Sequence, residues 1–474
     1  MKLFLINMYG LIDARILDKN AEYLGLNMEK LMENAGKAVA DVVLSLKPKN
    51  VLVVCGSGNN GGDGYVTAIN LKKNGVNVDV YMAKMPKSQL CIKKYNEAKE
   101  EGVNIVNFFD PSKYDVIVDA MLGIGIEKDP EEPYRSLIEK INVSRKTIVS
   151  VDVPTGIGTN VSIKPDITVT MQFSKREMNE KNSGKIIVAD VGFPRELLEM
   201  VGPGEFVSYK FNPDESHKGE NGILVGIAGS VDYYGAPIYM SKGALRMGID
   251  LLFLFSPEYI HNYISSSTHD IILKKSGERY IEFNNELKRI IEDKATAVAL
   301  GCGIGKNEVS QESSTKIIEE SLLVKKPIVI DADALDSVTL FDDLKGFAVI
   351  TPHRGEFKRI FSIDPDENNV VKMAKKYNLV ILLKGSVDII SDGEIVKKNK
   401  SFHHPSMTRG GTGDILTGAV GGLLSRGIDT FHSATLASFI VGSAGKMAFE
   451  EKSNSYFTSE VIDMIPQVFR KYVQ

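Results

Sequence analysis

Short apolar runs alternate with longer stretches of helical periodicity through the first 190 residues. Apolar positions recur at helical spacing from about Asp13 to Leu46, which predicts one or two helices before the first strand. The run VLVVC at 51–55 is typical of a strand buried on both faces of a parallel sheet. This alternation predicts a doubly wound α/β domain, with further strands at 76–81, 104–108, 114–120, 147–153, 167–171 and 185–189.

A second series of the same kind fills the rest of the chain. It predicts a strand within 217–230, then a helix to about Met247, and strands at 250–255 and 295–300. Three further strands are predicted: one that starts at 327, one that ends at 351 and one that starts at 379. A chain of 474 residues is too long for one ordinary core. Because Gly and Pro break the pattern at 188–206, we expect two domains, 1–210 and 211–474.

Composition narrows the class of protein. A net charge of −4 without a basic stripe argues against nucleic acid as a partner. Three cysteines without a C-x-x-C pair argue against a disulfide framework or a zinc site. No window reaches the roughly 20 apolar residues of a membrane span, and the opening residues lack a signal cleavage site. We therefore expect a cytoplasmic protein that is neither secreted nor membrane-bound.

Polar residues follow three strands of the first domain. The loop GSGNNGGDG at 56–64 carries two asparagines and Asp63 after the first buried strand. VDAMLGIG and VDVPTG place Asp119 and Asp152 at two more strand ends, where open α/β sheets bind ligands. Amide and carboxylate oxygens suit a ribose, a hydroxylated ring or a hard alkali cation. The dinucleotide fingerprint G-x-G-x-x-G matches only weakly, and a loop that merely turns the chain remains the alternative.

The segment MTRGGTGDILTGAVGGLLSRG at 407–427 organises the second domain. Its first glycines allow consecutive amides to turn toward one anion at a helix N-terminus. Asp414 would then lie where a general base for a phosphate-accepting hydroxyl belongs. Gly418, Gly421 and Gly422 share one helical face, which lets the helix lie close to a sheet or a nucleotide. The alternative is a glycine-rich turn that caps an ordinary core helix.

Taken together, the motifs resemble the two-domain NAD(P)H-hydrate repair enzymes, and the resemblance spans nearly the whole chain. The motifs in the first half are GSGNNGGDG, VDAMLGIG and VDVPTG; those in the second are HKG, GSVDYYGAP, GCGIG, DADAL, TPHRGEF and GGTGDILTG. The resemblance implies a Rossmann-like α/β/α domain followed by a ribokinase-like α/β domain, with NAD(P)H hydrate and an adenine nucleotide as ligands. We also expect a homo-oligomer.

For the first half, the resemblance implies an epimerase that interconverts the R and S forms of hydrated NADH or NADPH. It implies a potassium ion at Asn60, Asp119 and Thr155, and an acid/base role for Asp152. Substrate contacts are implied at Asn59, Asn60, Gly61, Gly62, Asp63, Gly123, Ile124, Gly125, Ile126, Glu127, Lys128, Asp129 and Asp152.

For the second half, it implies a dehydratase that uses ADP, or ATP in some lineages, with Mg²⁺. Phosphorylation would turn the hydroxyl of the S hydrate into a phosphate leaving group, with Asp414 as the base and Gly411, Thr412 and Gly413 as the anion hole. Substrate contacts are implied at Ala236, Gly303, His353 and Asp414, and nucleotide contacts at Lys384, Gly385, Ser386, Val387, Asp388 and Gly413.

The chain departs from the family pattern at four positions. Asp388 and Ile124 stand where threonine is common, Asp336 replaces a frequent asparagine, and Cys302 replaces a frequent proline. A carboxylate at 388 would repel phosphates, so we expect its side chain to point away from them or to meet a cation.

Two rival functions remain open. One is a small-molecule kinase fused to a nucleotide-binding module, whose phosphorylated product would accumulate. The other is non-enzymatic, with the first half serving as a ligand sensor or protein-binding module.

Overall fold

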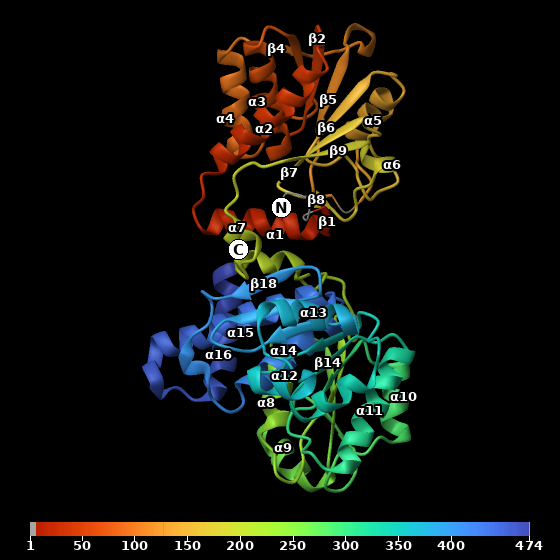
Figure 1. Cartoon of the computed structure of the whole chain (residues 1–474), viewed down its shortest axis with the longest axis vertical. Helices are drawn as coiled ribbons and strands as arrows, with labels where there is room; N and C mark the ends of the chain where they lie inside the picture. Colours follow the sequence, from red (N-terminus) through yellow and green to blue (C-terminus); the bar gives the residue numbers. More distant parts are fainter. Residues whose placement is uncertain (1–5, 127, 474) are drawn as a thin grey trace. The chain divides into compact units, whose positions relative to one another are not determined.

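A computed structural model describes residues 6–126 and 128–473. The chain forms two compact units, Met1–Leu198 and Glu199–Gln474, each built on a sheet that is wholly or mostly parallel (Figure 1). The predicted α/β class is confirmed in both units. Among the described residues, no helix is both long and apolar enough to cross a bilayer.

The first unit contains a seven-stranded parallel sheet in the order β4-β3-β2-β5-β6-β7-β9. All seven strands lie where the apolar runs predict them. α2, α3 and α4 pack on one face of the sheet and α5 on the other. The bounds are β2 (Asn50–Cys55), β3 (Asn77–Met82), β4 (Asn104–Val106), β5 (Val116–Ala120), β6 (Thr147–Val151), β7 (Ile167–Met171), β9 (Lys185–Ala189), α1 (Leu11–Tyr23), α2 (Met28–Ser45), α3 (Asn59–Lys73), α4 (Gln89–Glu100), η1 (Pro111–Lys113), α5 (Tyr134–Asn142), α6 (Glu180–Ser183) and α7 (Arg195–Leu198).

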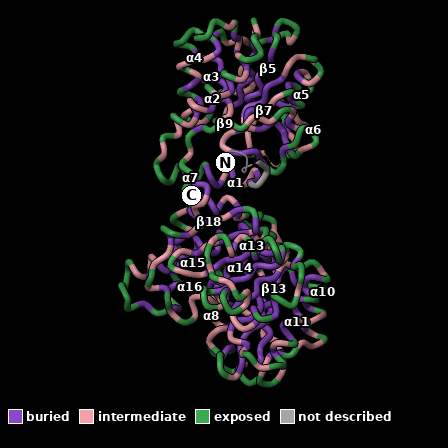
Figure 2. The backbone as a smooth tube through the Cα atoms, viewed as in Figure 1, coloured by how far each residue is buried: buried purple, intermediate pink, exposed green. Residues whose placement is uncertain are grey.

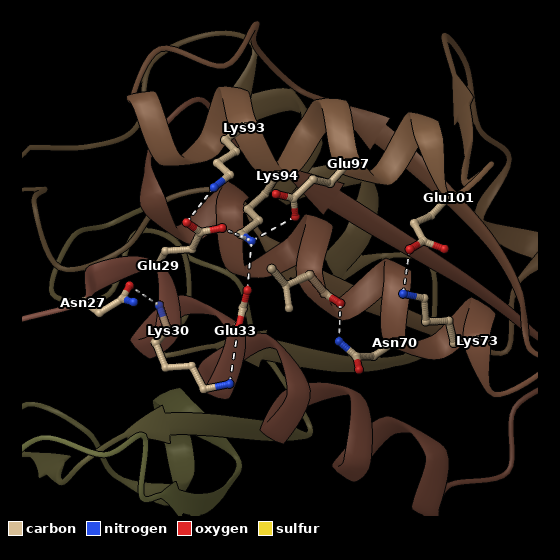
Figure 3. A network of polar contacts seen from close by, with 11 residues as sticks. Asn27, Glu29, Lys30, Glu33, Asn70, Lys73, Lys93, Lys94, Glu97 and Glu101 are labelled. Atoms are coloured by element: carbon tan, nitrogen blue, oxygen red, sulfur yellow. Dashed lines mark hydrogen bonds and ion pairs between the residues drawn. The ribbon is translucent and has the colours of Figure 1, made fainter.

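Polar contacts tie α2 to α4 on the outside of this unit (Figure 3). The Lys94 side chain is 3% exposed, and its Nζ lies 2.8 Å from Glu29, 3.3 Å from Glu33 and 2.9 Å from Glu97. Burial opposes the charge on Lys94, but the three carboxylates outweigh it and raise the lysine pKa. Every proton of the ammonium therefore has an acceptor, and the network serves packing.

A small parallel pair of strands, β1 (Ile6–Tyr9) with β8 (Ser174–Lys175), was not predicted. Tyr9 lies opposite Lys175, and α1 begins two residues later. A two-residue strand containing a lysine has no apolar run to reveal it. It nevertheless brings the start of α1 beside the segment that carries Lys175.

The second unit contains a nine-stranded sheet in the order β12-β11-β10-β13-β14-β15-β16-β17-β18. The strands β10 to β16 are parallel, and β17 and β18 add antiparallel neighbours at one edge. The sequence predicts neither the edge strand β12 nor β18, because both are short and carry lysines. The bounds are β10 (Ile223–Ile227), β11 (Leu251–Ser256), β12 (Ile272–Lys275), β13 (Ala297–Leu300), β14 (Ile328–Ile330), β15 (Ala348–Ile350), β16 (Val380–Leu383), β17 (Asp388–Ser391) and β18 (Val396–Asn399).

Helices cover both faces of this sheet, and buried residues concentrate between the layers (Figure 2). α10 to α13 enclose a core on one face, while α8, α14 and α15 pack on the other. The bounds are α8 (Ala236–Leu245), α9 (His261–Ser267), α10 (Asn285–Asp293), α11 (Glu308–Leu323), α12 (Arg354–Phe361), α13 (Glu367–Tyr377), α14 (Thr412–Ser425), α15 (Thr430–Lys452), α16 (Thr458–Tyr472), η2 (Pro203–Ser208), η3 (Glu258–Ile260), η4 (Ala332–Leu340), η5 (Pro405–Met407) and η6 (Ser453–Ser455).

The division between the units precedes the boundary expected near residue 210. The Gly- and Pro-rich segment around η2 belongs to the second unit's core. Glu205 is fully buried and accepts hydrogen bonds from Lys397 at 2.9 Å and Thr435 at 2.7 Å. The Phe206 ring meets Phe439 at 5.9 Å between centroids. A segment that composition marks as a linker is thus anchored by burial.

The glycine face of α14 packs against protein. A Cβ on Gly418 would overlap the carbonyl oxygen of Met240 in α8, and one on Gly422 would lie 2.8 Å from that of Ala244. Gly421 faces Leu224 and Ala299 of the sheet. The bare face therefore sets how closely α14 approaches α8 and the sheet, and so where Asp414 at its first turn is held.

Replacing Gly418 by alanine should lower the free energy of unfolding of the second unit by about 1–3 kcal/mol, because the added methyl overlaps backbone that cannot yield. Thermal and urea unfolding measure the loss. Gly410→Ala is the matched control, since a Cβ there meets nothing within 4 Å. Equal stability of the two variants would contradict the packing argument.

Candidate active sites

Asp119 is the centre of a buried polar cluster at the C-terminal ends of β5 and β6. The Thr155 hydroxyl donates to Asp119 Oδ1 at 2.6 Å, while the Thr155 amide and Ser150 hydroxyl donate to Oδ2 at 2.9 Å. Burial raises the pKa of Asp119, and these hydrogen bonds oppose the rise. The carboxylate is fully buried yet surrounded by donors rather than by a cationic side chain.

Asn60 lies beside the same cluster. A Cβ on Gly123 would be 3.6 Å from the Asn60 Cβ, and the neighbouring Leu122 amide donates to Thr155 Oγ1 at 3.0 Å. Asn60 Nδ2 is buried and has no hydrogen-bond partner among the described residues. The structure thus brings together the three residues for which the sequence predicts potassium binding.

Asp152 has a backbone conformation that residues other than glycine seldom adopt. Its φ is +62°, which marks a strained position of the kind that clusters at functional sites. Its carboxylate accepts from the Met171 amide at 3.0 Å and pairs with the Lys175 ammonium. Lys175 is 1% exposed and also donates to Thr170 at 2.7 Å. The strained aspartate is therefore held by a buried lysine.

Lys175 was missed at the sequence level because it lies in the unpredicted strand β8. Asp63, the fifth residue of α3, belongs to the same neighbourhood. Burial raises the Asp63 pKa well above its ordinary value, and the charge on Asp152 raises it further. A buried carboxyl with a raised pKa and a second carboxyl paired with a lysine are the kind of groups that serve as proton donor and proton acceptor.

The other residues predicted to contact the epimerase substrate have different structural roles. Asn59 begins α3 and accepts a hydrogen bond from Ser88 at 2.7 Å. Asp129 accepts from the Asn160 amide at 2.8 Å, so it braces a loop. Ile124 packs with Val153 and its neighbours. Gly61 and Gly62 are buried, Gly123 and Ile126 are partly buried, Gly125 and Lys128 are exposed, and Glu127 lies outside the described residues.

In the second unit, α14 begins at the predicted glycine loop. Gly411 is its N-cap, with a φ of +92° that favours glycine, and the helix starts at Thr412. Asp414 lies in the first turn. Burial raises the pKa of its carboxyl to about 7, and the charge of Asp331 adds to the rise, against Cys302 and Lys384. The group is poised as a base near neutral pH.

Asp331 and Lys384 form an ion pair behind the glycine loop. Lys384 Nζ lies 2.8 Å from Asp331 Oδ1, and the Thr417 hydroxyl donates to Oδ2 at 2.7 Å. Lys384 Nζ also lies 3.3 Å from where a Cβ on Gly413 would be. Burial opposes the lysine charge, but Asp331 and Glu356 raise its pKa. An ammonium is thus fixed beside the anion hole. Neither Asp331 nor Thr417 had been singled out as a site residue.

A pocket of about 430 Å³ opens beside this pair. Five predicted ligand-binding residues, which come from strand ends and from α14, line it together. Ser386 and Val387 lie in the turn between β16 and β17 and are not among the residues that line the pocket. The five are His353, Lys384, Gly385, Asp388 and Gly413.

His353 caps α12. Its side chain is 61% exposed, and Nδ1 accepts from the amides of Gly355 at 3.0 Å and Glu356 at 3.2 Å. Nε2 lies 3.6 Å from Glu356 Oε1, so both ring nitrogens face the first turn of α12. His353 is thus an exposed helix cap that lines the pocket.

Asp388 is buried, and its carboxylate accepts hydrogen bonds from two protein donors. The Gly385 amide donates to it at 3.1 Å and the Ser438 hydroxyl at 2.7 Å. Burial raises its pKa, opposed first by the charge of His403 and then by these hydrogen bonds. The repulsion of phosphates that its charge would cause is thus reduced by its hydrogen-bond donors.

Ala236 and Gly303 lie on the other side of Asp414. A Cβ on Gly303 would be 2.9 Å from the Ala236 Cβ and 2.7 Å from that of Tyr233. Gly303 follows β13 and Ala236 follows β10, whereas His353 and Lys384 follow β15 and β16. Along the sheet order, the predicted substrate contacts Ala236 and Gly303 therefore lie on one side of the glycine loop, and the pocket with Lys384 lies on the other.

Comparisons with known proteins agree with this arrangement. A family model described as "NAD(P)H-hydrate dehydratase" matches residues 224–467, and one described as "YjeF-related protein N-terminus" matches 28–177. A ribokinase-like superfamily protein of Enterococcus faecalis shares the fold of the second unit, with a TM-score of 0.51 at 20% identity over 56% of this chain and 93% of its own.

Curated relatives match along the entire chain. "Bifunctional NAD(P)H-hydrate repair enzyme Nnr" of Archaeoglobus fulgidus is 37% identical, covering 96% of this chain and 97% of its own length. The protein of the same name from Pyrobaculum aerophilum is 36% identical, covering 97% and 98%. The chain therefore belongs to the family of bifunctional NAD(P)H-hydrate repair enzymes.

Proposed function

We propose that the second unit dehydrates the S form of hydrated NADH or NADPH and that the first unit supplies it by epimerising the R form. The observation that carries the first part is Asp414, whose carboxyl has a pKa of about 7 beside the glycine loop and the Lys384 ammonium. A base, an anion hole and a fixed cation are the parts that phosphoryl transfer to a hydroxyl requires.

In this mechanism Asp414 removes the proton from the hydroxyl of the hydrated ring. The hydroxyl oxygen then takes the terminal phosphoryl group of ADP or ATP, while the amides of Gly411 to Gly413 and Lys384 balance its charge. The ring nitrogen expels phosphate, and loss of a proton from the adjacent carbon restores the double bond. Phosphate is a better leaving group than hydroxide, so phosphorylation allows the carbon–oxygen bond to break.

The pocket lined by His353 and Lys384 is proposed to hold the adenine nucleotide. Mg²⁺ would enter with the phosphates, which supply most of its ligands and whose charge it neutralises. ADP and ATP both fit a site that recognises a terminal phosphoryl group through backbone amides.

For the first unit, we propose Asp152 and Asp63 as the acid/base pair, with Lys175 holding Asp152 in place. The cluster of Asn60, Asp119 and Thr155 fits potassium, because its amide, carboxylate and hydroxyl oxygens are hard ligands and its buried carboxylate has no cationic side chain beside it. The ion would supply positive charge that orients the dinucleotide. Cytoplasmic location and homo-oligomeric assembly remain predictions, and three buried free cysteines fit the former.

Asp414→Asn should lower the dehydratase rate by roughly 10²–10⁴-fold, because an amide cannot accept the hydroxyl proton. NAD(P)H absorbance recovered from purified S hydrate with ADP, and then ATP, measures it. Folding a carboxyl with a raised pKa costs free energy above its unfolded pKa, so the variant should be at least as stable at pH 8. Unchanged turnover would remove Asp414 from the mechanism. Accumulation of a stable phosphorylated product would favour the kinase rival.

Dehydratase turnover should rise with pH through about 7 and then level off, because only ionised Asp414 acts as a base. Asp331→Asn removes a neighbouring negative charge, so the half-maximal point of kcat should move to lower pH. If kcat reached half its maximum at the same pH in the wild type and in the Asp331→Asn protein, Asp331 would not raise the pKa of Asp414 as inferred.

Asp152→Asn should abolish interconversion of the R and S hydrates, with a loss of at least about 100-fold. NMR of the mixed epimers without nucleotide follows the exchange. Dehydration of S hydrate by the same polypeptide is the internal control and should be unchanged. A variant that still epimerises at the wild-type rate would favour the sensor reading of the first unit.

A further inference from the structure

Four exposed tyrosines gather at the C-terminal ends of β10 and β11. Tyr233 and Tyr234 follow β10 and are each 54% exposed, while Tyr259 and Tyr263 follow β11 and are 53% and 52% exposed. Aromatic rings of this size are usually buried or in contact with a ligand when several occur together. None of the four has a role in the mechanism above.

Ring and cation contacts join these residues into one surface. The rings of Tyr234 and Tyr263 are stacked, with centroids 5.1 Å apart and planes 29° from parallel. The Arg279 guanidinium lies over the Tyr259 ring at 5.2 Å, and the Arg279 carbonyl accepts from the Val231 amide at 3.3 Å. Tyr234, Tyr259, Tyr263 and Arg279 are called the tyrosine platform below.

Arg279 gives the platform its cationic group. Arg279 is exposed, and the acids nearest to it in sequence and on η3, Glu278 and Glu258, form ion pairs with Lys275. A planar cation over a ring and two stacked phenols together suit a heteroaromatic ring that carries phosphate.

The platform continues the predicted substrate side of the site. Tyr233, which precedes Tyr234, lies against Gly303 next to Ala236. The nucleotide pocket lies past β14, at the ends of β15 and β16, whereas the platform lies in the opposite direction, at β10, β11 and the residues after β12. An acceptor whose reacting ring meets Asp414 opposite the phosphoryl donor must extend along the strand ends away from the donor.

We propose that the tyrosine platform binds the adenine end of the hydrated dinucleotide, with the base stacked on the outer face of the Tyr234–Tyr263 pair and the phosphates facing Arg279. This inference rests on the proposed dehydratase function. The occupant is the far half of the substrate, because the surface begins where the contacts to its reacting half end and because its aromatic and cationic groups match an adenosine phosphate. Stacking on an aromatic ring commonly strengthens nucleotide binding by about tenfold or more.

A truncated substrate separates this role from the chemistry. Hydrated reduced nicotinamide mononucleotide carries the reacting ring but no adenosine. For Tyr234→Ala and Tyr263→Ala, KM for S-NADH hydrate should rise about tenfold, while KM for the hydrated mononucleotide, KM for ADP and kcat stay at wild-type values. Tyr234→Phe keeps the stacking face and is the matched control; it should behave as wild type.

Arg279→Gln provides a second variant that leaves the ring stack intact. It should raise KM for the dinucleotide hydrate severalfold and weaken competitive inhibition by ADP-ribose, measured against S-NADH hydrate, by a similar factor. Thermal unfolding checks that each variant is folded. Unchanged KM for the dinucleotide in all three variants, or an equal rise for the mononucleotide, would overturn the inference. A wild-type protein that does not dehydrate either hydrate would instead refute the proposed function.

Discussion

The second active site depends on two carboxyl groups and one ammonium held behind a glycine loop. Asp331 is buried and gives one oxygen to Lys384 and the other to Thr417, so its charge is fixed in place. That charge has two effects: it raises the pKa of Lys384 against burial, and it adds to the rise that burial causes in the pKa of Asp414. One buried carboxylate thereby influences both the ammonium beside the glycine loop and the carboxyl in the first turn of α14.

The first unit also combines two carboxyl groups with one buried lysine. Asp152 stays paired to the buried Lys175 in a strained backbone conformation, and its negative charge, after burial itself, raises the pKa of Asp63. In both units, burial and then the charge of a neighbouring carboxylate raise the pKa of one acid, Asp63 or Asp414.

The sequence predicts the parts of this structure that buried parallel strands determine. Continuous apolar runs locate the central strands of both sheets, and the polar residues that follow them meet at one edge, as with Asp119 and Thr155. The family prediction, made from the motifs, is confirmed by relatives that match along the whole chain.

What escaped prediction depends on tertiary contacts that leave no local pattern. Lys175 lies in a two-residue strand, and β12 is a four-residue edge strand that ends in two lysines. The segment around Glu205 looks like a linker in the sequence, but it belongs to the core. Glu205 can be buried there because Lys397 and Thr435 donate hydrogen bonds to its carboxylate. Asp388 would repel phosphate by its charge, but its donors are 50 residues away in sequence at Ser438 and nearby at Gly385.

The most direct test is to titrate the Asp414 carboxyl itself. Protein labelled with ¹³C at the aspartate carboxyl carbons, compared with the same sample of the Asp414→Asn protein, identifies the resonance of Asp414, whose shift is then followed against pH. A midpoint of about 7 is the result that the buried site with its neighbouring Asp331 predicts. A midpoint near the ordinary aspartate value of 3.8 would show that the carboxyl is solvated, and would contradict the account.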